Sequence, residues 1–136
     1  MSPSSTLRAW LNADFIAAAF DETERAFLRE SLLPNGDNPY YPVETAETRD
    51  TVFLLSVGEL ERYFPTEEDR IAYATDYAKT QGVVYYDQRC WYWTRSNGTR
   101  AANVSYINTG GVFVHKHLST YKYAVRHAIR CAVPEG

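Results

Sequence analysis

The sequence predicts a single α+β domain over residues 1–136, with helices in the N-terminal half and an antiparallel sheet in the C-terminal half. Apolar residues recur at helical spacing near the N-terminus, whereas apolar and polar residues alternate after Gly82. Helices that precede the strands, rather than alternate with them, are typical of α+β domains. A chain of 136 residues also suits one domain with its own core.

Residues 5–33 are expected to form two helices, because their apolar side chains recur every three or four positions. Asp21 and Glu24 form a capping box that opens the second helix. Residues 34–39 hold two prolines, two asparagines and a glycine, and therefore predict a loop. The apolar faces consist of Trp10, Leu11, Phe15 and Ile16 in the first helix and Phe27, Leu28 and Leu32 in the second.

Residues 51–55 form a short apolar run that predicts a buried strand. A second capping box, Ser56 with Glu59, opens a short helix that stops at the following proline. A further helix is expected to begin at Thr66 and to end at Gly82, since glycine is a common helix terminator.

After Gly82 the apolar pattern has a period of two, which indicates β-strands. Asn97-Gly98 and Gly110-Gly111 are typical of the turns that join antiparallel neighbours. The five expected strands cover residues 83–86, 91–94, 103–106, 112–115 and 123–126.

Charge and hydropathy argue against two classes of partner. The formal net charge is −3, whereas binding to nucleic acid through general electrostatics needs a clustered cationic surplus. No apolar run approaches the length of about 18 residues that a membrane span needs, and the first residues lack the pattern of a signal peptide. We therefore expect no nucleic-acid partner and no membrane insertion.

Tyrosine is unusually frequent in this chain. Aromatic residues make up 15% of it, and eleven of them are tyrosines. Tyrosine is enriched in recognition surfaces, because it offers a large rigid contact area with a polar tip. It also suits β-strands, so the enrichment is compatible with recognition, with a sheet, or with both.

Candidate groups for catalysis or metal binding are few. Cys90 and Cys131 leave a disulfide and two free thiols as open alternatives. Cys90 with His115 or His127 offers the residue types of a nucleophile and a base, but no motif brings them together, so an enzyme using Cys90 is the less favoured alternative. His115 and His117 share one strand face, but zinc needs further ligands, and none is nearby in the sequence. We expect no catalytic residues, no metal and no cofactor.

Several short motifs occur in an order that resembles a known family. They are residues 6–12, 52–56, 91–96 and 125–128, with Arg70, Thr75, Tyr77, Ala78 and Gly82 between them. The chain resembles a bacterial and phage domain family with a C-type-lectin-like fold. It is also similar to the variable proteins of diversity-generating retroelements, which share that fold. His127 replaces the usual proline of the last motif, and the paired catalytic cysteines of the formylglycine-generating enzymes, which have the same fold, are absent.

The resemblance implies ligand binding by diversified side chains on a rigid scaffold. It implies a variable region at about residues 90–132 that recognises a protein or glycan on a target surface, for a phage or a bacterium. Diversification acts at adenines and cannot produce Trp or Lys. The positions that it implies to be constant are Trp91, Trp93, Lys116 and Lys122.

Strand alternation sharpens this expectation. If Val104, Val112 and Val114 face the core, the residues between them face solvent. Tyr92, Phe113 and Tyr121 are then aromatic anchors, and replacing Tyr92 and Tyr121 with Ala would remove binding without changing the melting temperature. The expected ligand-binding residues are Tyr92, Thr94, Asn97, Thr99, Arg100, Asn103, Ser105, Phe113, His115, His117, Ser119 and Tyr121.

The alternative is a non-diversified interaction or structural domain of the same fold, in which these polar residues form only the solvated face of a sheet. Trp91 and Trp93 are expected in the core in either case. Arg95 and Arg126 are expected to be structural, each pairing with a buried carboxylate or with backbone carbonyls.

Overall fold

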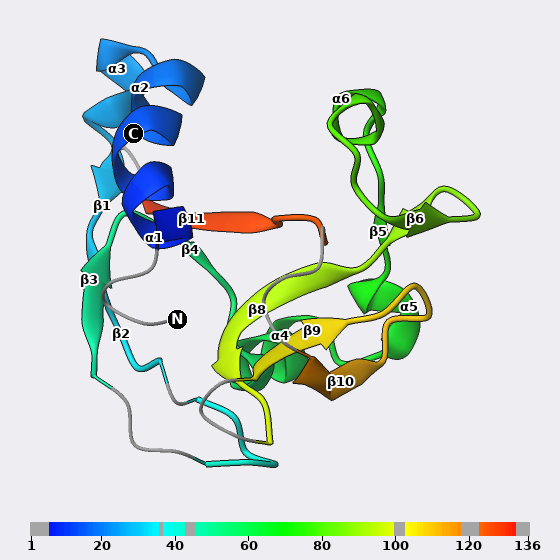
Figure 1. The fold of residues 1–136 in the computed structure, drawn as a ribbon. Coiled ribbons are helices and arrows are strands. Elements are labelled where there is room, and N and C mark those ends of the chain that lie inside the picture. The colour runs from blue at the N-terminus through cyan, green and yellow to red at the C-terminus, as the bar shows by residue number, and fades with distance from the viewer. Residues whose placement is uncertain (1–5, 36, 43–45, 100–102, 118–122, 133–136) are drawn as a thin grey trace.

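A computed structural model describes residues 6–35, 37–42, 46–99, 103–117 and 123–132, with the backbone alone at Lys116 and His117. The chain folds into mixed helices and strands, which confirms the α+β class (Figure 1). In chain order the elements are α1 (Thr6–Trp10), a π-helical turn η1 (Leu11–Phe15), α2 (Ile16–Ala19), α3 (Glu22–Arg25), β1 (Leu28–Arg29), β2 (Ser31–Leu33), β3 (Thr48–Asp50), β4 (Val52–Leu54), α4 (Val57–Tyr63), α5 (Glu67–Arg70), β5 (Ala72–Tyr73), α6 (Asp76–Thr80), β6 (Tyr85–Tyr86), β7 (Arg89–Cys90), β8 (Tyr92–Asn97), β9 (Val104–Ile107), β10 (Phe113–His117) and β11 (His127–Cys131).

The N-terminal helices match the prediction only in part. α1, η1 and α2 continue one another, and α3 opens at the expected capping box of Asp21 with Glu24. The second helix was expected to continue to residue 33, and this expectation is wrong. Leu28 instead pairs with Cys131 in β11, and β2 pairs with β3. Pairing with distant strands has overridden the local helical spacing.

The last strand, β11, pairs with two strands from the N-terminal half of the chain. β11 lies between β1 and β4, antiparallel to both, with Ala128 opposite Phe53. The strand expected at residues 123–126 therefore begins four residues later than predicted. Residues 123–126 form one isolated β-bridge to β8, between Tyr92 and Ala124.

β8, β9 and β10 form the antiparallel meander that the alternating pattern predicted. The amide of Gly98 donates to the carbonyl of Asn103 at 2.8 Å where β8 turns toward β9. Gly111, between β9 and β10, has a φ of 79°, and a Cβ there would lie 1.8 Å from the carbonyl oxygen of Glu67. Only glycine fits this close approach.

Residues 72–90 form a projection, which we call the arm. It comprises α6 and the small sheet β5–β7–β6, and it stands at the upper right of Figure 1, apart from the N-terminal helices. The single helix expected from Thr66 to Gly82 is wrong, because Ala72 and Tyr73 pair with β7 and Thr75 caps a new helix. Gly82 follows that helix with a φ of 83°, as expected of a terminator.

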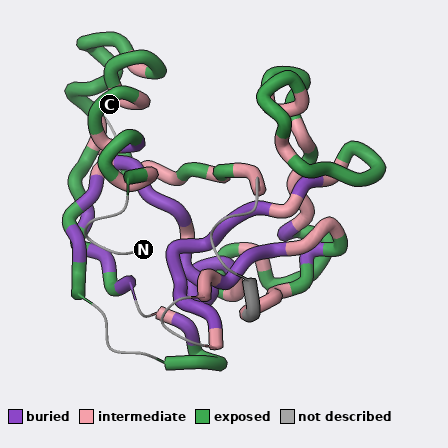
Figure 2. The backbone as a smooth tube through the Cα atoms, in the orientation of Figure 1, coloured by how far each residue is buried: buried purple, intermediate pink, exposed green. Residues whose placement is uncertain are grey.

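Both faces of the meander pack against other elements of the fold. One face packs into a cluster with Leu11, Val52 and Leu54, and the other packs onto Leu60 of α4. All six residues of β8 are buried, and burial is concentrated where β4, β8 and β9 meet (Figure 2). No helix in the described ranges is long and apolar enough to cross a bilayer.

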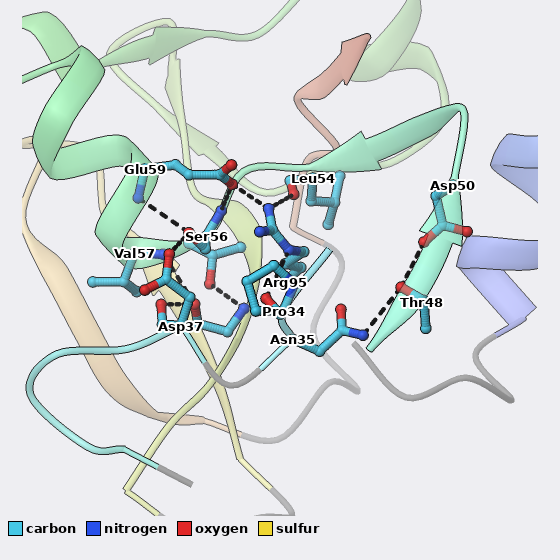
Figure 3. Close-up of polar contacts among 12 residues, drawn as sticks. Pro34, Asn35, Asp37, Thr48, Asp50, Leu54, Ser56, Val57, Glu59 and Arg95 are labelled. Atoms are coloured by element: carbon cyan, nitrogen blue, oxygen red, sulfur yellow. Dashed lines mark hydrogen bonds and ion pairs between the residues drawn. The ribbon is translucent and has the colours of Figure 1, made fainter. Parts of the chain in front are cut away.

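A buried ion pair ties α4 to β8 (Figure 3). The guanidinium of Arg95, 1% exposed, bonds to the carboxylate of Glu59 and donates to the carbonyl of Leu54 at 2.9 Å. Burial alone would raise the pKa of Glu59, but hydrogen bonds from Arg95 and Ser56 outweigh it and hold that pKa below its usual value. The structural role expected for Arg95 is confirmed.

The side chain of Asn12 joins the N-terminal helix to β4. Its Oδ1 accepts from the amides of Thr51 at 2.7 Å and Val52 at 2.9 Å, and its Nδ2 donates to the carbonyl of Val52 at 2.8 Å. Asn12→Ala should lower the free energy of unfolding by about 1–3 kcal/mol, because it leaves backbone groups unpaired. Urea denaturation measures this, with the exposed Asp14→Ala of the same turn as control. Equal effects of the two changes would contradict the assignment.

Candidate functional site

Four of the expected ligand-binding residues are buried. Tyr92 is 2% exposed, Thr94 1%, Asn97 9% and Ser105 0%, so the expectation that they face solvent is wrong. The Tyr92 hydroxyl donates to the carbonyl of Arg70 at 2.6 Å, and Thr94 Oγ1 donates to the carbonyl of Ser105 at 2.8 Å. Alternation placed Val104 and Val114 correctly against the core, whereas Val112 is 39% exposed, so that part of the expectation is wrong. α4 and the loop at residues 37–41 contact the opposite face, which carries the candidates, and exclude water from it.

The other candidates are half-buried or lie outside the described residues. Phe113 packs onto Leu60 and Ile107, with the Arg70 guanidinium 4.5 Å from its ring centroid. The half-buried candidates are Thr99, Asn103, Phe113 and His115. The candidates not described are Arg100, Ser119, Tyr121 and the side chain of His117. Of the expected constant positions, Lys122 and the side chain of Lys116 are likewise not described. Trp93 is buried in the core as expected, and Trp91 packs against it, half-buried.

A groove of about 880 Å³ lies between the arm and residues 123–127, and we call it the arm groove. One wall comes from β5 and α6, and the opposite wall comes from the segment that leads into β11. Cys90, Tyr92 and Ala124 line it as well, and Trp10 of α1 also reaches it. The groove therefore joins parts of the chain more than 60 positions apart.

The described lining of the arm groove is mainly apolar and includes one Trp and four Tyr residues. Tyr73 is 65% exposed, Tyr77 74% and Trp10 48%. Tyr123 also lines the groove, and it stacks on Trp91 with ring centroids 6.0 Å apart. Exposed aromatic side chains in a concave site provide large apolar contact area at low entropic cost.

A family model described as a domain of unknown function, DUF6273, matches residues 3–132. The chain belongs to the DUF6273 family. No curated protein and no solved structure matches it. Because the match includes both walls of the arm groove, the groove lies within the DUF6273 domain itself.

Cys90 has the properties of a structural thiol in this DUF6273 domain. It is 3% exposed, its Sγ lies 3.6 Å from the carbonyl oxygen of Ala72, and burial raises its pKa. A catalytic cysteine needs the opposite shift, because the thiolate is the nucleophile. Cys90 and Cys131 are both free thiols, which decides against the disulfide alternative.

Arg126 lines the arm groove and is half-buried. Its guanidinium donates to the Tyr92 hydroxyl at 3.2 Å and lies 4.9 Å from the ring centroid of Phe64 and 5.4 Å from that of Tyr92. The expected partners, a buried carboxylate or carbonyls, are thus replaced by aromatic groups.

His115 occupies a second cluster of the DUF6273 domain, at the opposite end of the meander from the arm. Its ring lies 5.6 Å from that of Tyr40 and 5.0 Å from that of Tyr41, and its Nδ1 is 2.6 Å from Ser105 Oγ. Among the described side chains, no group of three His, Cys, Asp or Glu residues is placed to hold a metal ion. The cluster fastens the loop at residues 37–41 to the sheet.

Acid should weaken this cluster. Burial lowers the pKa of His115 below its usual value, although Glu61 opposes the shift. Between the ordinary pKa of about 6.5 and the lowered value, the unfolded chain binds more protons than the folded one, so stability falls as pH falls through that interval. Urea denaturation at several pH values should show this loss in the native protein and a smaller one in His115→Gln. Identical pH profiles would contradict the assignment.

Sequence reasoning missed the arm groove. Its residues were assigned to an uninterrupted helix and to strands, which would have left no projection. The available signal was local: Thr75 is a good N-cap in the middle of the expected helix, and its Oγ1 accepts from the amide of Ala78 at 3.1 Å. The opposite wall carries no such signal, because it depends on contacts with distant segments.

Proposed function

We propose that this DUF6273 domain is a non-catalytic binding module that captures an apolar segment of a partner protein in the arm groove. The observation that carries the proposal is a concave site of about 880 Å³ with exposed tyrosines on its arm wall. Ligand sites usually have volumes of about 300–1,000 Å³ and mostly apolar linings with few polar groups. The buried Cys90 thiol supports binding rather than catalysis.

The lining favours a protein segment over a glycan. Of the lining residues that the structure describes, none is Asp, Glu or Asn. A glycan offers many hydroxyls, and burying them without hydrogen-bond partners would be costly. Apolar and aromatic side chains of a partner protein would instead pack directly against Tyr73, Tyr77 and Trp10.

We further infer that the scaffold has a C-type-lectin-like fold, as the sequence motifs imply. The support is the return of β11 to lie between β1 and β4, next to the long meander of β8, β9 and β10. Within that fold we favour a fixed binding surface over a diversified one. Varying Ser105 would remove the buried bond from its Oγ to the backbone carbonyl of Asn97 at 2.7 Å. Varying Asn97 would remove the bond from its Nδ2 to the carbonyl of Tyr41 at 2.8 Å.

Selection from a random peptide library tests the proposed function. The immobilised domain should enrich peptides with aromatic and aliphatic residues. A variant carrying both Tyr73→Ser and Tyr77→Ser should bind them at least about tenfold more weakly, since aromatic anchors dominate binding energies. Its melting temperature should stay close to that of the native domain, because both side chains are exposed.

Tyr63→Ser is the matched control. Tyr63 is 59% exposed on α4 and does not line the arm groove, so its replacement should leave peptide binding unchanged. The proposal is contradicted if no peptide is enriched, or if the control and the arm variant bind equally well. Binding to a glycan array that depends on Tyr73 and Tyr77, without any enriched peptide, would replace the protein partner by a glycan.

A further inference from the structure

The arm groove has a charge that differs from the charge of the chain as a whole. The chain holds 17 acidic residues against 14 Lys and Arg. Among the described residues that line the groove, none is acidic, and Arg126 is the only Lys or Arg. A groove of positive charge in an acidic protein favours a ligand that brings a negative charge.

The guanidinium of Arg126 is held in place but not neutralised. Phe64 and Tyr92 lie beside it, and the Tyr92 hydroxyl accepts one of its hydrogen bonds. Within the described part of the chain, its guanidinium forms no ion pair with a carboxylate. Stacking on aromatic rings leaves the other N–H groups of a guanidinium available, and their planar arrangement suits a carboxylate.

We propose that Arg126 binds a carboxylate of the ligand, so that the segment captured in the arm groove carries an Asp or Glu side chain beside its apolar anchor. This inference rests on the proposed function and adds the charge of the ligand. An acidic side chain fits better than a C-terminal carboxylate, which is commonly held by free backbone amides. The amide of Ala124, which lines the groove near Arg126, already donates to the carbonyl of Trp91 at 2.7 Å.

Two dyes that differ only in charge test the chemistry of the site. 8-Anilinonaphthalene-1-sulfonate carries one negative charge, and N-phenyl-1-naphthylamine has the same rings without the sulfonate. Fluorescence titration should show that both bind the native domain. Arg126→Gln should raise the dissociation constant of the anionic dye about tenfold or more and leave that of the neutral dye within about twofold.

Further variants separate charge from packing. Arg126→Lys keeps the positive charge and should retain most of the affinity for the anionic dye. Arg130→Gln, at an exposed position of β11 outside the groove, should change neither dye. If Arg126→Gln does not fold, added NaCl gives the same test on the native domain, because salt should weaken only the anionic dye.

The outcomes separate this inference from the proposed function. If neither dye binds and the peptide library yields nothing, the arm groove is not a binding site and both proposals fail. If both dyes bind but neither Arg126→Gln nor salt alters the anionic one, only the role of Arg126 is overturned. The peptide library shows which group of the ligand supplies the carboxylate. Peptides selected by the native domain should carry an internal Asp or Glu, and those selected by Arg126→Gln should not. Selection of peptides that bind only through a free C-terminal carboxylate would contradict the inference that Arg126 binds an Asp or Glu side chain.

Discussion

Replacing Arg95 with Met should lower the free energy of unfolding by about 3–5 kcal/mol, the usual cost of removing one partner of a buried ion pair. The change leaves the Glu59 carboxylate buried without its cation. It also removes the donors to the carbonyls of Leu54, at 2.9 Å, and Pro34, at 3.3 Å. Urea denaturation followed by circular dichroism measures the effect.

Arg62→Met is the control for that substitution. Arg62 is exposed on α4, so the same change of side chain should alter stability by no more than about 0.5 kcal/mol. Arg95→Lys should fall between the two, because it keeps the charge but loses the planar fork of donors. A loss below 1 kcal/mol for Arg95→Met would show that the pair contributes little to holding α4 against β8.

Replacing Tyr92 with Ala should lower the free energy of unfolding by about 3–5 kcal/mol, as truncation of a buried aromatic residue generally does. Tyr92 is 2% exposed, packs with Leu60 and Ile107, and donates through its hydroxyl to the carbonyl of Arg70 at 2.6 Å. This prediction reverses the expectation from the sequence, in which Tyr92 was an exposed ligand anchor whose loss would leave the melting temperature unchanged.

Tyr86→Ala is the matched comparison, since Tyr86 is 71% exposed at the end of the arm. Its replacement should change stability by no more than about 0.5 kcal/mol. Thermal denaturation of the two variants provides the comparison. Similar melting temperatures for both variants would contradict the burial of Tyr92 and the packing of α4 on that face of the meander.

The features that the sequence predicts well are local ones. The capping boxes at Asp21 and Ser56 are both present, because each depends on residues three positions apart. The meander of β8, β9 and β10 also follows from turn residues and alternation within about 25 residues. Arg95 was correctly expected to be structural, since a charged residue in an apolar strand needs a buried partner.

The errors arise where distant segments meet. The spacing of Leu28 from its apolar neighbours predicts a helix, but Leu28 forms a strand because it pairs with Cys131, about a hundred positions later. Alternation separated the two faces of β8 and β9, yet it carries no information on whether α4 covers the second face. The arm groove is the extreme case, because its walls come from residues 71–83 and 123–127, and neither stretch indicates the other.

The central claim is that the arm groove, and not the face of the meander, receives the ligand. Chemical-shift mapping on the ¹⁵N-labelled native domain, titrated with the most enriched library peptide, tests it directly. The largest amide shifts should occur on the two groove walls, at Tyr77, Ala78 and Val125. Largest shifts at Thr99 and Asn103, beside the turn between β8 and β9, would contradict the claim and support the surface that the sequence first suggested.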